Sequence, residues 1–199
     1  MELNDETLRF IREHCKDDVR NLALQAPKYP GVDMPVALTQ IAGRQAAAEK
    51  IPSWHEEEGI LYPRHLSLEQ CSSEATARYK ASIIPESSSG TLTDLTGGFG
   101  IDCAFLSPKF HHVTYVERQE VLCEIASHNF PLLGLNHIRI ENKDAIRYLQ
   151  EMSSVDWIFI DPARRDGHGG KTVASRGFYF FSPARGGGPR REDCCHCRL

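Results

Sequence analysis

The chain has 199 residues, of which 41% are hydrophobic, and a formal net charge of −4. This length suits one large domain or two small ones, and the charge gives no overall signature of nucleic-acid binding. No apolar run approaches the roughly 20 residues that a membrane-spanning helix needs, and the acidic amino terminus lacks the features of a signal peptide. Seven cysteines without disulfide-scaffold spacing suit a reducing compartment. We therefore expect a cytoplasmic protein without membrane contact.

The amino-terminal part of the chain has the pattern of a helical region. Capping residues followed by apolar positions one turn apart predict three helices. Their predicted starts are Asn4 or Asp5, Asp17 or Asp18, and Asp33. Residues 53–66 lack a regular pattern, apart from a short strand expected at 60–62. Ser67 with Gln70 fits a capping box for a further helix that runs to about Ile84.

A loop at 85–90 separates this helical region, residues 1–84, from a segment in which short apolar runs alternate with helical patterns. Such alternation predicts an α/β fold, with a parallel sheet and helices on both of its faces. The predicted strands are 92–95, 113–116, 137–141 and 157–160, and the predicted helices are 101–107, 119–130 and 145–152.

The most informative motif joins the first predicted strand to its helix. Asp94 closes the strand, and the turn that follows contains Gly97, Gly98 and Gly100. Glycine has no side chain and adopts positive φ, so a ligand can lie against the end of the strand, where open α/β sheets bind nucleotide-like cofactors. Asp94 can accept hydrogen bonds from the turn amides or from a ligand ammonium group. The alternative is a helix-entry turn that binds nothing.

Two further acids follow predicted strands. Glu117 ends the second strand about twenty residues beyond the turn, at the spacing where an acid reaches the ribose hydroxyls of a nucleoside cofactor. Asp144 follows the third strand, and it can bond an adenine amino group or cap the helix that begins at Ala145. These two roles of Asp144 are compatible.

An Asp-Pro element follows the fourth predicted strand. Asp161 is expected at the carboxyl edge of the sheet, where it can accept a hydrogen bond from a nucleophilic amine and direct the amine lone pair toward an electrophile. Pro162 restricts the local backbone, and Arg164 and Arg165 offer contacts to phosphate. The alternative is an ordinary Asp-Pro turn with solvated arginines.

Together these elements resemble the motifs of class I S-adenosylmethionine-dependent methyltransferases. The element at 161–164 resembles a variant of the Asp/Asn-Pro-Pro-aromatic motif of amino-group methyltransferases. Residues 70–77 are similar to the segment before the glycine-rich motif in trimethylguanosine synthase-type RNA methyltransferases. Residues 1 to about 174 resemble a bacterial methyltransferase family with a helical amino-terminal region and a THUMP-like carboxy-terminal domain.

The resemblance implies a Rossmann-like domain over 85–174 that binds S-adenosylmethionine and methylates, without a metal, an RNA base amino group. RNA as the substrate is implied by the THUMP-bearing relatives. The implied cofactor-binding residues are Asp94, Thr96, Gly97, Gly98, Phe99, Gly100, Glu117, Asp144 and Ala145. Asp161 and Pro162 would orient the acceptor, and Arg164 stands where the motif has an aromatic residue.

The chain also departs from the family pattern. The THUMP-like part is missing, and four of the seven strands of the family sheet are recognisable. Residues 175–199 are crowded with Arg, Gly and Cys, and within them only 178–181 suggests a strand. We therefore expect a truncated domain and hypothesise that the tail is read in a shifted frame. Residues 194–197 read Cys-Cys-His-Cys, and ligands that are direct neighbours in the chain cannot readily surround one tetrahedral zinc ion, so no metal is expected.

Two alternatives to an active methyltransferase stay open. The first is a non-catalytic remnant that binds S-adenosylmethionine weakly or not at all. The second is a nicotinamide-dependent oxidoreductase, which predicts a Gly-x-Gly-x-x-Gly turn. The turn of this chain instead reads Gly97-Gly98-Phe99-Gly100, with no further glycine before Pro108.

Overall fold

The computed structural model describes residues 3–85, 90–161 and 179–181. Their packing forms two compact units, one within residues 1–69 and one within residues 70–199. The helix at 74–83 belongs to the second unit, although the sequence grouped it with the amino-terminal helices. The functional domains at 1–84, 85–174 and 175–199 stay a prediction.

The first unit is helical. Its elements are α1 (Asp5–Glu13), α2 (Val19–Leu24), η1 (Ala26–Lys28), α3 (Met34–Lys50), α4 (Pro52–Glu56) and α5 (His65–Gln70), the last residue of which opens the second unit. The side chains of Asn4, Asp18 and Asp33 each accept a backbone N–H from the first turn of α1, α2 and α3. These three caps confirm the predicted helix starts. The core of this unit contains Phe10, Leu22, Met34, Ala37 and Ile41.

Three expectations for the first 84 residues are wrong. The stretch expected to be irregular from residue 53 begins inside the helix α4 (Pro52–Glu56), which has a proline in its first turn. Residues 60–62 form no strand, because the Gln40 side chain satisfies the backbone of Tyr62: it donates to the Tyr62 carbonyl at 2.9 Å and accepts from the Tyr62 N–H at 2.8 Å. The helix predicted from Ser67 to Ile84 is two helices. Ser73 starts the second of them by accepting a hydrogen bond from the Thr76 N–H.

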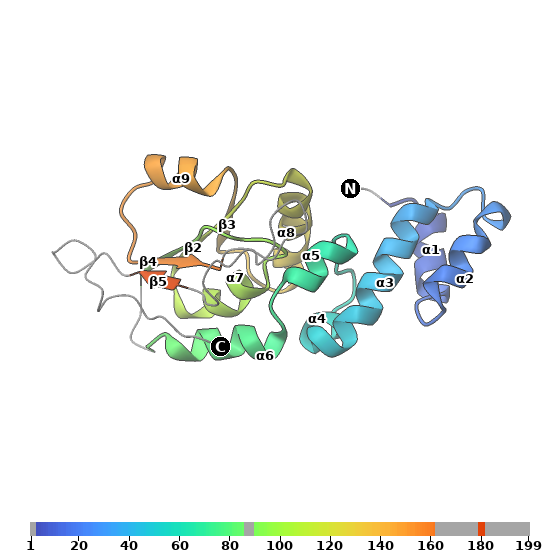
Figure 1. The fold of residues 1–199 in the computed structure, drawn as a ribbon, viewed down its shortest axis with the longest axis horizontal. Coiled ribbons are helices and arrows are strands. Elements are labelled where there is room, and N and C mark those ends of the chain that lie inside the picture. The colour runs from blue at the N-terminus through green and yellow to red at the C-terminus, as the bar shows by residue number, and fades with distance from the viewer. Residues whose placement is uncertain (1–2, 86–89, 162–178, 182–199) are drawn as a thin grey trace, which may run out of the picture. The chain divides into compact units, whose positions relative to one another are not determined.

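The second unit is built on a five-stranded sheet. Its elements are α6 (Glu74–Ile83), β1 (Thr91–Asp94), α7 (Ile101–Leu106), η2 (Ser107–Lys109), β2 (His112–Glu117), α8 (Glu120–Leu132), β3 (Ile138–Asn142), α9 (Ala145–Glu151), β4 (Trp157–Ile160) and β5 (Tyr179–Phe181). The strand order is β3-β2-β1-β4-β5. The first four strands are parallel, and β5 pairs with β4 in the antiparallel direction. Figure 1 shows α6 and α7 on one side of the strands and α9 on the other.

This arrangement confirms the predicted α/β fold and places the acids that follow the strands. Because β1 to β4 are parallel, their carboxyl ends lie at one edge of the sheet. Asp94 and Glu117 are the last residues of β1 and β2, while Asp144 and Asp161 come after β3 and β4. Strand β5 lies in the tail at 175–199, where the sequence allowed a strand. Pro162, Arg164 and the cysteine-rich end lie outside the described residues.

Candidate functional site

Asp94 is a buried carboxylate with one oxygen satisfied and one left over. Its side chain is 1% exposed, and Oδ1 accepts the Thr96 N–H at 2.9 Å and the Thr96 hydroxyl at 3.3 Å. Oδ2 is buried and has no hydrogen-bond partner among the described residues. Burial disfavours the charged form and raises the pKa of Asp94 to about 7. Burying a carboxylate oxygen without a hydrogen-bond partner costs free energy of folding. A cationic group that binds Oδ2 would therefore make a favourable interaction.

The three glycines of the turn have different roles. A Cβ at Gly97 would collide with the ring of Tyr115, and a Cβ at Gly100 would lie 2.9 Å from Phe130. Packing of the turn on the sheet and on α8 therefore requires both residues to be glycine. Gly98 has φ of +54°, and the nearest atom to a Cβ there is the Thr96 carbonyl oxygen at 3.7 Å. Among the three, Gly98 is the position that leaves open space beside the strand ends.

Glu117 connects the turn to the end of β2. Its Oε2 accepts the N–H of Gly98 at 2.9 Å, and its Oε1 accepts the N–H of Gln119 at 2.8 Å. The hydroxyl of Tyr115 donates to the carbonyl of Gly98, so both backbone groups of Gly98 are held by β2. A carboxylate offers about four acceptor positions, and these bonds leave further positions for ligand hydroxyls.

Thr96 joins the turn to the residue after β4. Its hydroxyl accepts the backbone N–H of Asp161 at 2.8 Å, while the same hydroxyl donates to Asp94. Phe99, which the sequence placed around the cofactor, is buried with 3% exposure. The structure therefore brings Asp94, Thr96, Gly98 and Glu117 together with the backbone of Asp161 at one edge of the sheet.

Asp144 caps α9. Its Oδ1 accepts the N–H groups of Ile146 and Arg147 at 3.0 and 3.2 Å, which confirms the capping role foreseen for it. Ala145 is the first residue of that helix. Whether either residue contacts an adenine stays a prediction, and the predicted roles of Pro162 and Arg164 fall outside the described residues.

Sequence reasoning missed a cluster of charged residues that is formed by Lys80, Asp102 and Asp161. The Lys80 ammonium lies 2.6 Å from Oδ2 of Asp161 and 2.9 Å from Oδ2 of Asp102. Burial is also the main reason that the pKa of Asp102 is raised, and the nearby Lys80 opposes this shift. One signal in the sequence was available: Ala77, Lys80 and Ile84 follow a helical i, i+3, i+7 spacing, and a lysine on such an apolar face needs a buried partner.

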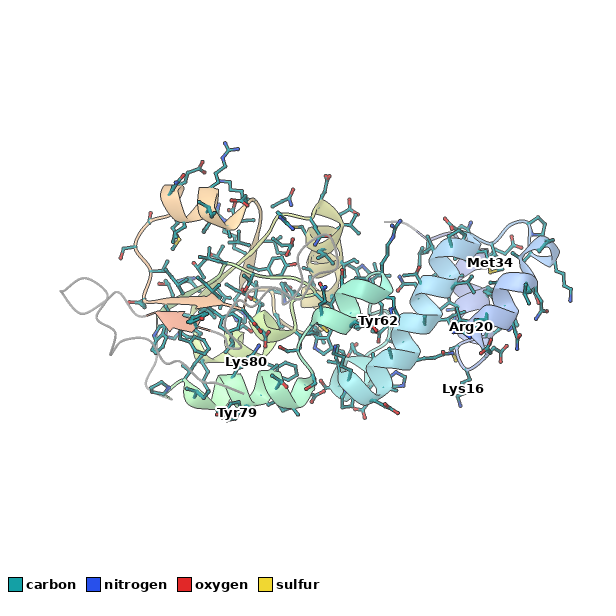
Figure 2. The ribbon with its side chains drawn as sticks, in the orientation of Figure 1. Lys16, Arg20, Met34, Tyr62, Tyr79 and Lys80 are labelled. Atoms are coloured by element: carbon teal, nitrogen blue, oxygen red, sulfur yellow. The ribbon has the colours of Figure 1, made fainter. Side chains whose placement is uncertain are left out.

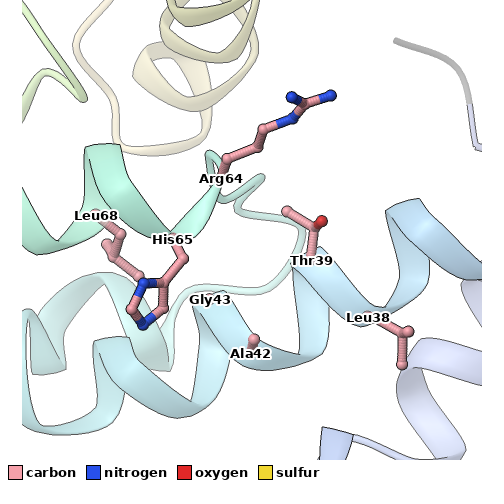
Figure 3. Close-up of a pocket in the computed structure, with 7 residues that line it drawn as sticks. All are labelled: Leu38, Thr39, Ala42, Gly43, Arg64, His65 and Leu68. Atoms are coloured by element: carbon pink, nitrogen blue, oxygen red, sulfur yellow. The ribbon is translucent and has the colours of Figure 1, made fainter. Parts of the chain in front are cut away.

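A hollow of about 220 Å³ lies within the first unit. Figure 3 shows the side chains that line it: Leu38, Thr39, Ala42, Gly43, Arg64, His65 and Leu68. The lining is mainly apolar, and none of the predicted site residues belongs to it. Over the described ranges, no helix has the length and apolar character needed to cross a membrane. No group of three or more His, Cys, Asp or Glu residues suited to a metal was found among the same residues.

Comparison with known proteins supports the fold. No protein-family model matches the chain, and no curated protein matches its sequence. The crystal structure of a candidate methyltransferase from Porphyromonas gingivalis W83 matches with a TM-score of 0.65 and 28% sequence identity, over 83% of this chain and 43% of that chain. The fold is methyltransferase-like. The chain spans less than half the length of the P. gingivalis protein.

Other solved methyltransferases match more weakly. A protein-L-isoaspartate O-methyltransferase has a TM-score of 0.40 and 16% identity, over 83% of this chain and 60% of that one. An rRNA methylase from Streptococcus thermophilus has a TM-score of 0.31 and 21% identity, over 35% of this chain and 38% of that one. At these scores neither match adds to the fold assignment.

Proposed function

We propose that this chain binds S-adenosylmethionine at the carboxyl edge of its sheet and transfers the methyl group to an amino group of an RNA base. The observation that carries the cofactor assignment is the buried Asp94, whose Oδ2 has no partner among the described residues. An oxidoreductase of the nicotinamide-dependent class is less well supported, because its Gly-x-Gly-x-x-Gly turn is absent from 97–100.

The residues at the edge of the sheet fit this cofactor in charge and hydrogen-bonding capacity. When bound, S-adenosylmethionine supplies an activated methyl group on a positively charged sulfur. Oδ2 of Asp94 would accept from the ammonium of the methionine part, and the space beside Gly98 would receive that part. The spare acceptor positions of Glu117 would take the ribose hydroxyls, and Asp144 with Ala145 would lie by the adenine.

Asp161 would orient the acceptor. This role is supported by the position of Asp161 directly after β4, where its backbone N–H is bound by Thr96 of the glycine-rich turn. A carboxylate there accepts a hydrogen bond from the attacking amine and aligns its lone pair with the methyl group. The choice of an amino group rests on the resemblance of the element at 161–164 to the amino-group methyltransferase motif. The choice of RNA rests on the resemblance to THUMP-bearing relatives. A cytoplasmic location stays part of this proposal.

Calorimetric titration with S-adenosylmethionine tests the cofactor assignment. We expect the wild-type chain to bind, and Asp94→Asn and Glu117→Gln each to weaken binding by about tenfold or more, because each loses a hydrogen bond to a charged group. Glu151→Gln is the matched control, since Glu151, the last residue of α9, pairs with Lys143 and Arg147 and not with the turn. Binding of NAD in place of S-adenosylmethionine would overturn the assignment.

A transfer assay separates an active enzyme from a non-catalytic remnant. The chain is incubated with S-adenosylmethionine carrying a labelled methyl group and with ribosomal and transfer RNA from cells that lack the gene. We expect label in RNA, at a base amino group. A chain that binds the cofactor but leaves all RNA unlabelled would favour the remnant.

A further inference from the structure

Lys80 is a lysine in a core position. It lies on α6 between Ala77 and Ile84, whose side chains are 0% and 2% exposed, and it is itself 1% exposed. Figure 2 shows Lys80 between α6 and the strands, whereas its neighbour Tyr79 is 47% exposed. Lysine is almost never fully buried unless its charge is paired. The position therefore calls for a specific set of partners.

Three of the partners of the ammonium group are oxygen atoms within hydrogen-bonding distance. Nζ lies 2.8 Å from the Ser72 hydroxyl, 2.9 Å from Oδ2 of Asp102 and 2.6 Å from Oδ2 of Asp161. A lysine ammonium has three donors, so these three acceptors match it one for one. Ser72 also donates to Asp102 at 2.9 Å, and Nζ lies 5.3 Å from the ring centroid of Phe159. This set of acceptors fixes the direction of the buried ammonium group.

One consequence is that Asp161 is held from two sides. Its backbone N–H is bound by Thr96 and one carboxylate oxygen, Oδ2, is bound by Lys80. The side chain of Asp161 is 24% exposed, compared with 1% for Lys80. Within the described part of the chain, Oδ1 of Asp161 accepts no hydrogen bond. A carboxylate fixed through one oxygen presents the other in a defined direction.

We propose that Lys80 is a positioning residue for the acceptor: it fixes Oδ2 of Asp161 and leaves Oδ1 for the amino group that receives the methyl. This inference rests on the proposed function and extends it to Lys80, a residue of α6 that lies outside the motifs recognised in the sequence. Lys80 acts through Asp161 and makes no bond to the reacting atoms. Asp102 and Ser72 hold the ammonium in place for this role.

The first test needs neither cofactor nor acceptor. Urea unfolding is measured for the wild type, Lys80→Met, Asp161→Asn and the double variant. If Lys80 holds Asp161, the losses are not additive, and the double variant is about as stable as Lys80→Met alone. Should Lys80→Met fail to fold, Lys80→Arg and Lys80→Gln take its place in the cycle. Additive losses within experimental error would overturn the proposal.

A matched cycle uses Arg78→Met in place of Lys80→Met. Arg78 lies on the same helix and bonds Glu74 through its side chain at 2.6 Å. Its loss removes a cation from α6 without touching Asp161, so its effect and that of Asp161→Asn should add. Coupling of the same size in both cycles would show a general effect of charge on α6 and would overturn a specific role of Lys80.

The second test distinguishes positioning from a purely structural role. In the RNA assay with labelled cofactor, Lys80→Met should lower kcat by about tenfold to a hundredfold, while the Kd for S-adenosylmethionine changes by less than about threefold. Lys80→Arg should restore part of kcat, and Lys80→Met should cost nothing further in an Asp161→Asn background. Equal losses in kcat and cofactor affinity would overturn the proposal. A wild-type chain that binds no S-adenosylmethionine would overturn the proposed function instead, and the unfolding cycles would still decide whether Lys80 holds Asp161.

Discussion

The hydroxyl of Thr96 accepts the backbone N–H of Asp161 at 2.8 Å, although the two residues are 65 positions apart in the chain. The same hydroxyl donates to Oδ1 of Asp94 at 3.3 Å. One side chain therefore connects the glycine-rich turn after β1 with the first residue after β4. In the proposed function it connects the cofactor half of the site with the acceptor half.

Removing the Thr96 hydroxyl should destabilise the contacts of both Asp94 and Asp161. Thr96→Val keeps the shape of the side chain but leaves the Asp161 N–H without its acceptor and takes one donor from Asp94. We expect a loss of about 1–3 kcal/mol in the free energy of unfolding, measured by urea denaturation. Thr96→Ser retains the hydroxyl and should lose clearly less. A loss in Thr96→Ser as large as that in Thr96→Val would contradict this prediction, because removal of the methyl group would then cost as much as removal of the hydroxyl.

Asp94→Asn should change the pH dependence of stability. Burial raises the pKa of Asp94 from the ordinary 3.8 of an aspartate to about 7 in the folded chain. The folded state therefore holds this proton more tightly than the unfolded state. The contribution of this protonated carboxyl to the free energy of unfolding is fully present below about pH 4. It is lost as the pH rises through about 7, by up to about 4 kcal/mol. Without cofactor, Asp94→Asn should be more stable than the wild type above pH 7. Parallel pH profiles for the two proteins would contradict the raised pKa.

The affinity for S-adenosylmethionine should follow the charge of the same residue. A ligand ammonium binds the ionised form of Asp94, so the affinity should rise with pH up to about 7 and then level off, with a limiting slope of about tenfold per pH unit. Calorimetry across about pH 5.5 to 8.5 measures this profile. Asp94→Asn should bind more weakly and without this slope, and an unchanged slope in that variant would assign the titration to another group.

Alanine substitutions at the glycines should have different effects. Gly97→Ala places a methyl group against the buried ring of Tyr115 and should destabilise the fold by about 1–3 kcal/mol or more. Gly98→Ala meets no atom within 3.4 Å, so it should cost about 1–2 kcal/mol from its positive φ alone and should also weaken cofactor binding.

Gly134→Ala is the control for Gly98→Ala. Gly134 has φ of +73° and no atom within 4 Å of a Cβ, so an alanine there has a similar backbone strain. Gly134 lies between α8 and β3, away from the carboxyl edge of the sheet. Its thermal unfolding should shift to a similar degree, with unchanged affinity for S-adenosylmethionine. If the two variants bind the cofactor equally well, the space beside Gly98 is not part of the site.

Tyr115→Phe should weaken the attachment of the glycine-rich turn to β2. The ring of Tyr115 is buried, and its hydroxyl donates to the carbonyl of Gly98. Loss of this bond should cost about 1–2 kcal/mol of stability and lower the affinity for S-adenosylmethionine. Tyr62→Phe removes a hydroxyl from an equally buried tyrosine of the first unit, so it should leave cofactor affinity unchanged. A Tyr115→Phe variant with wild-type affinity would show that Gly98 needs no support from β2.

The sequence by itself determined the order and type of the elements from 91 to 160. Short apolar runs that end in an acid or a turn alternate with capped helical patterns there, and local propensity agrees with the tertiary fold. Helix starts at Asn4, Asp18 and Asp33 were equally predictable, because a capping side chain bonds a backbone N–H only a few residues away. The acids at 94, 117, 144 and 161 were found for the same reason, since each directly ends or follows a strand.

Only the tertiary structure decided the contacts between distant segments. The Gln40 side chain forms hydrogen bonds with the backbone of Tyr62, where the local pattern had predicted a strand. Lys80 meets Asp161 across 81 positions, and Thr96 meets it across 65. Such pairs depend on the register of parallel strands and on how α6 packs, which no local spacing encodes. Burial then raises the pKa of Asp94. The same carboxylate would be an ordinary surface acid if water could reach its second oxygen.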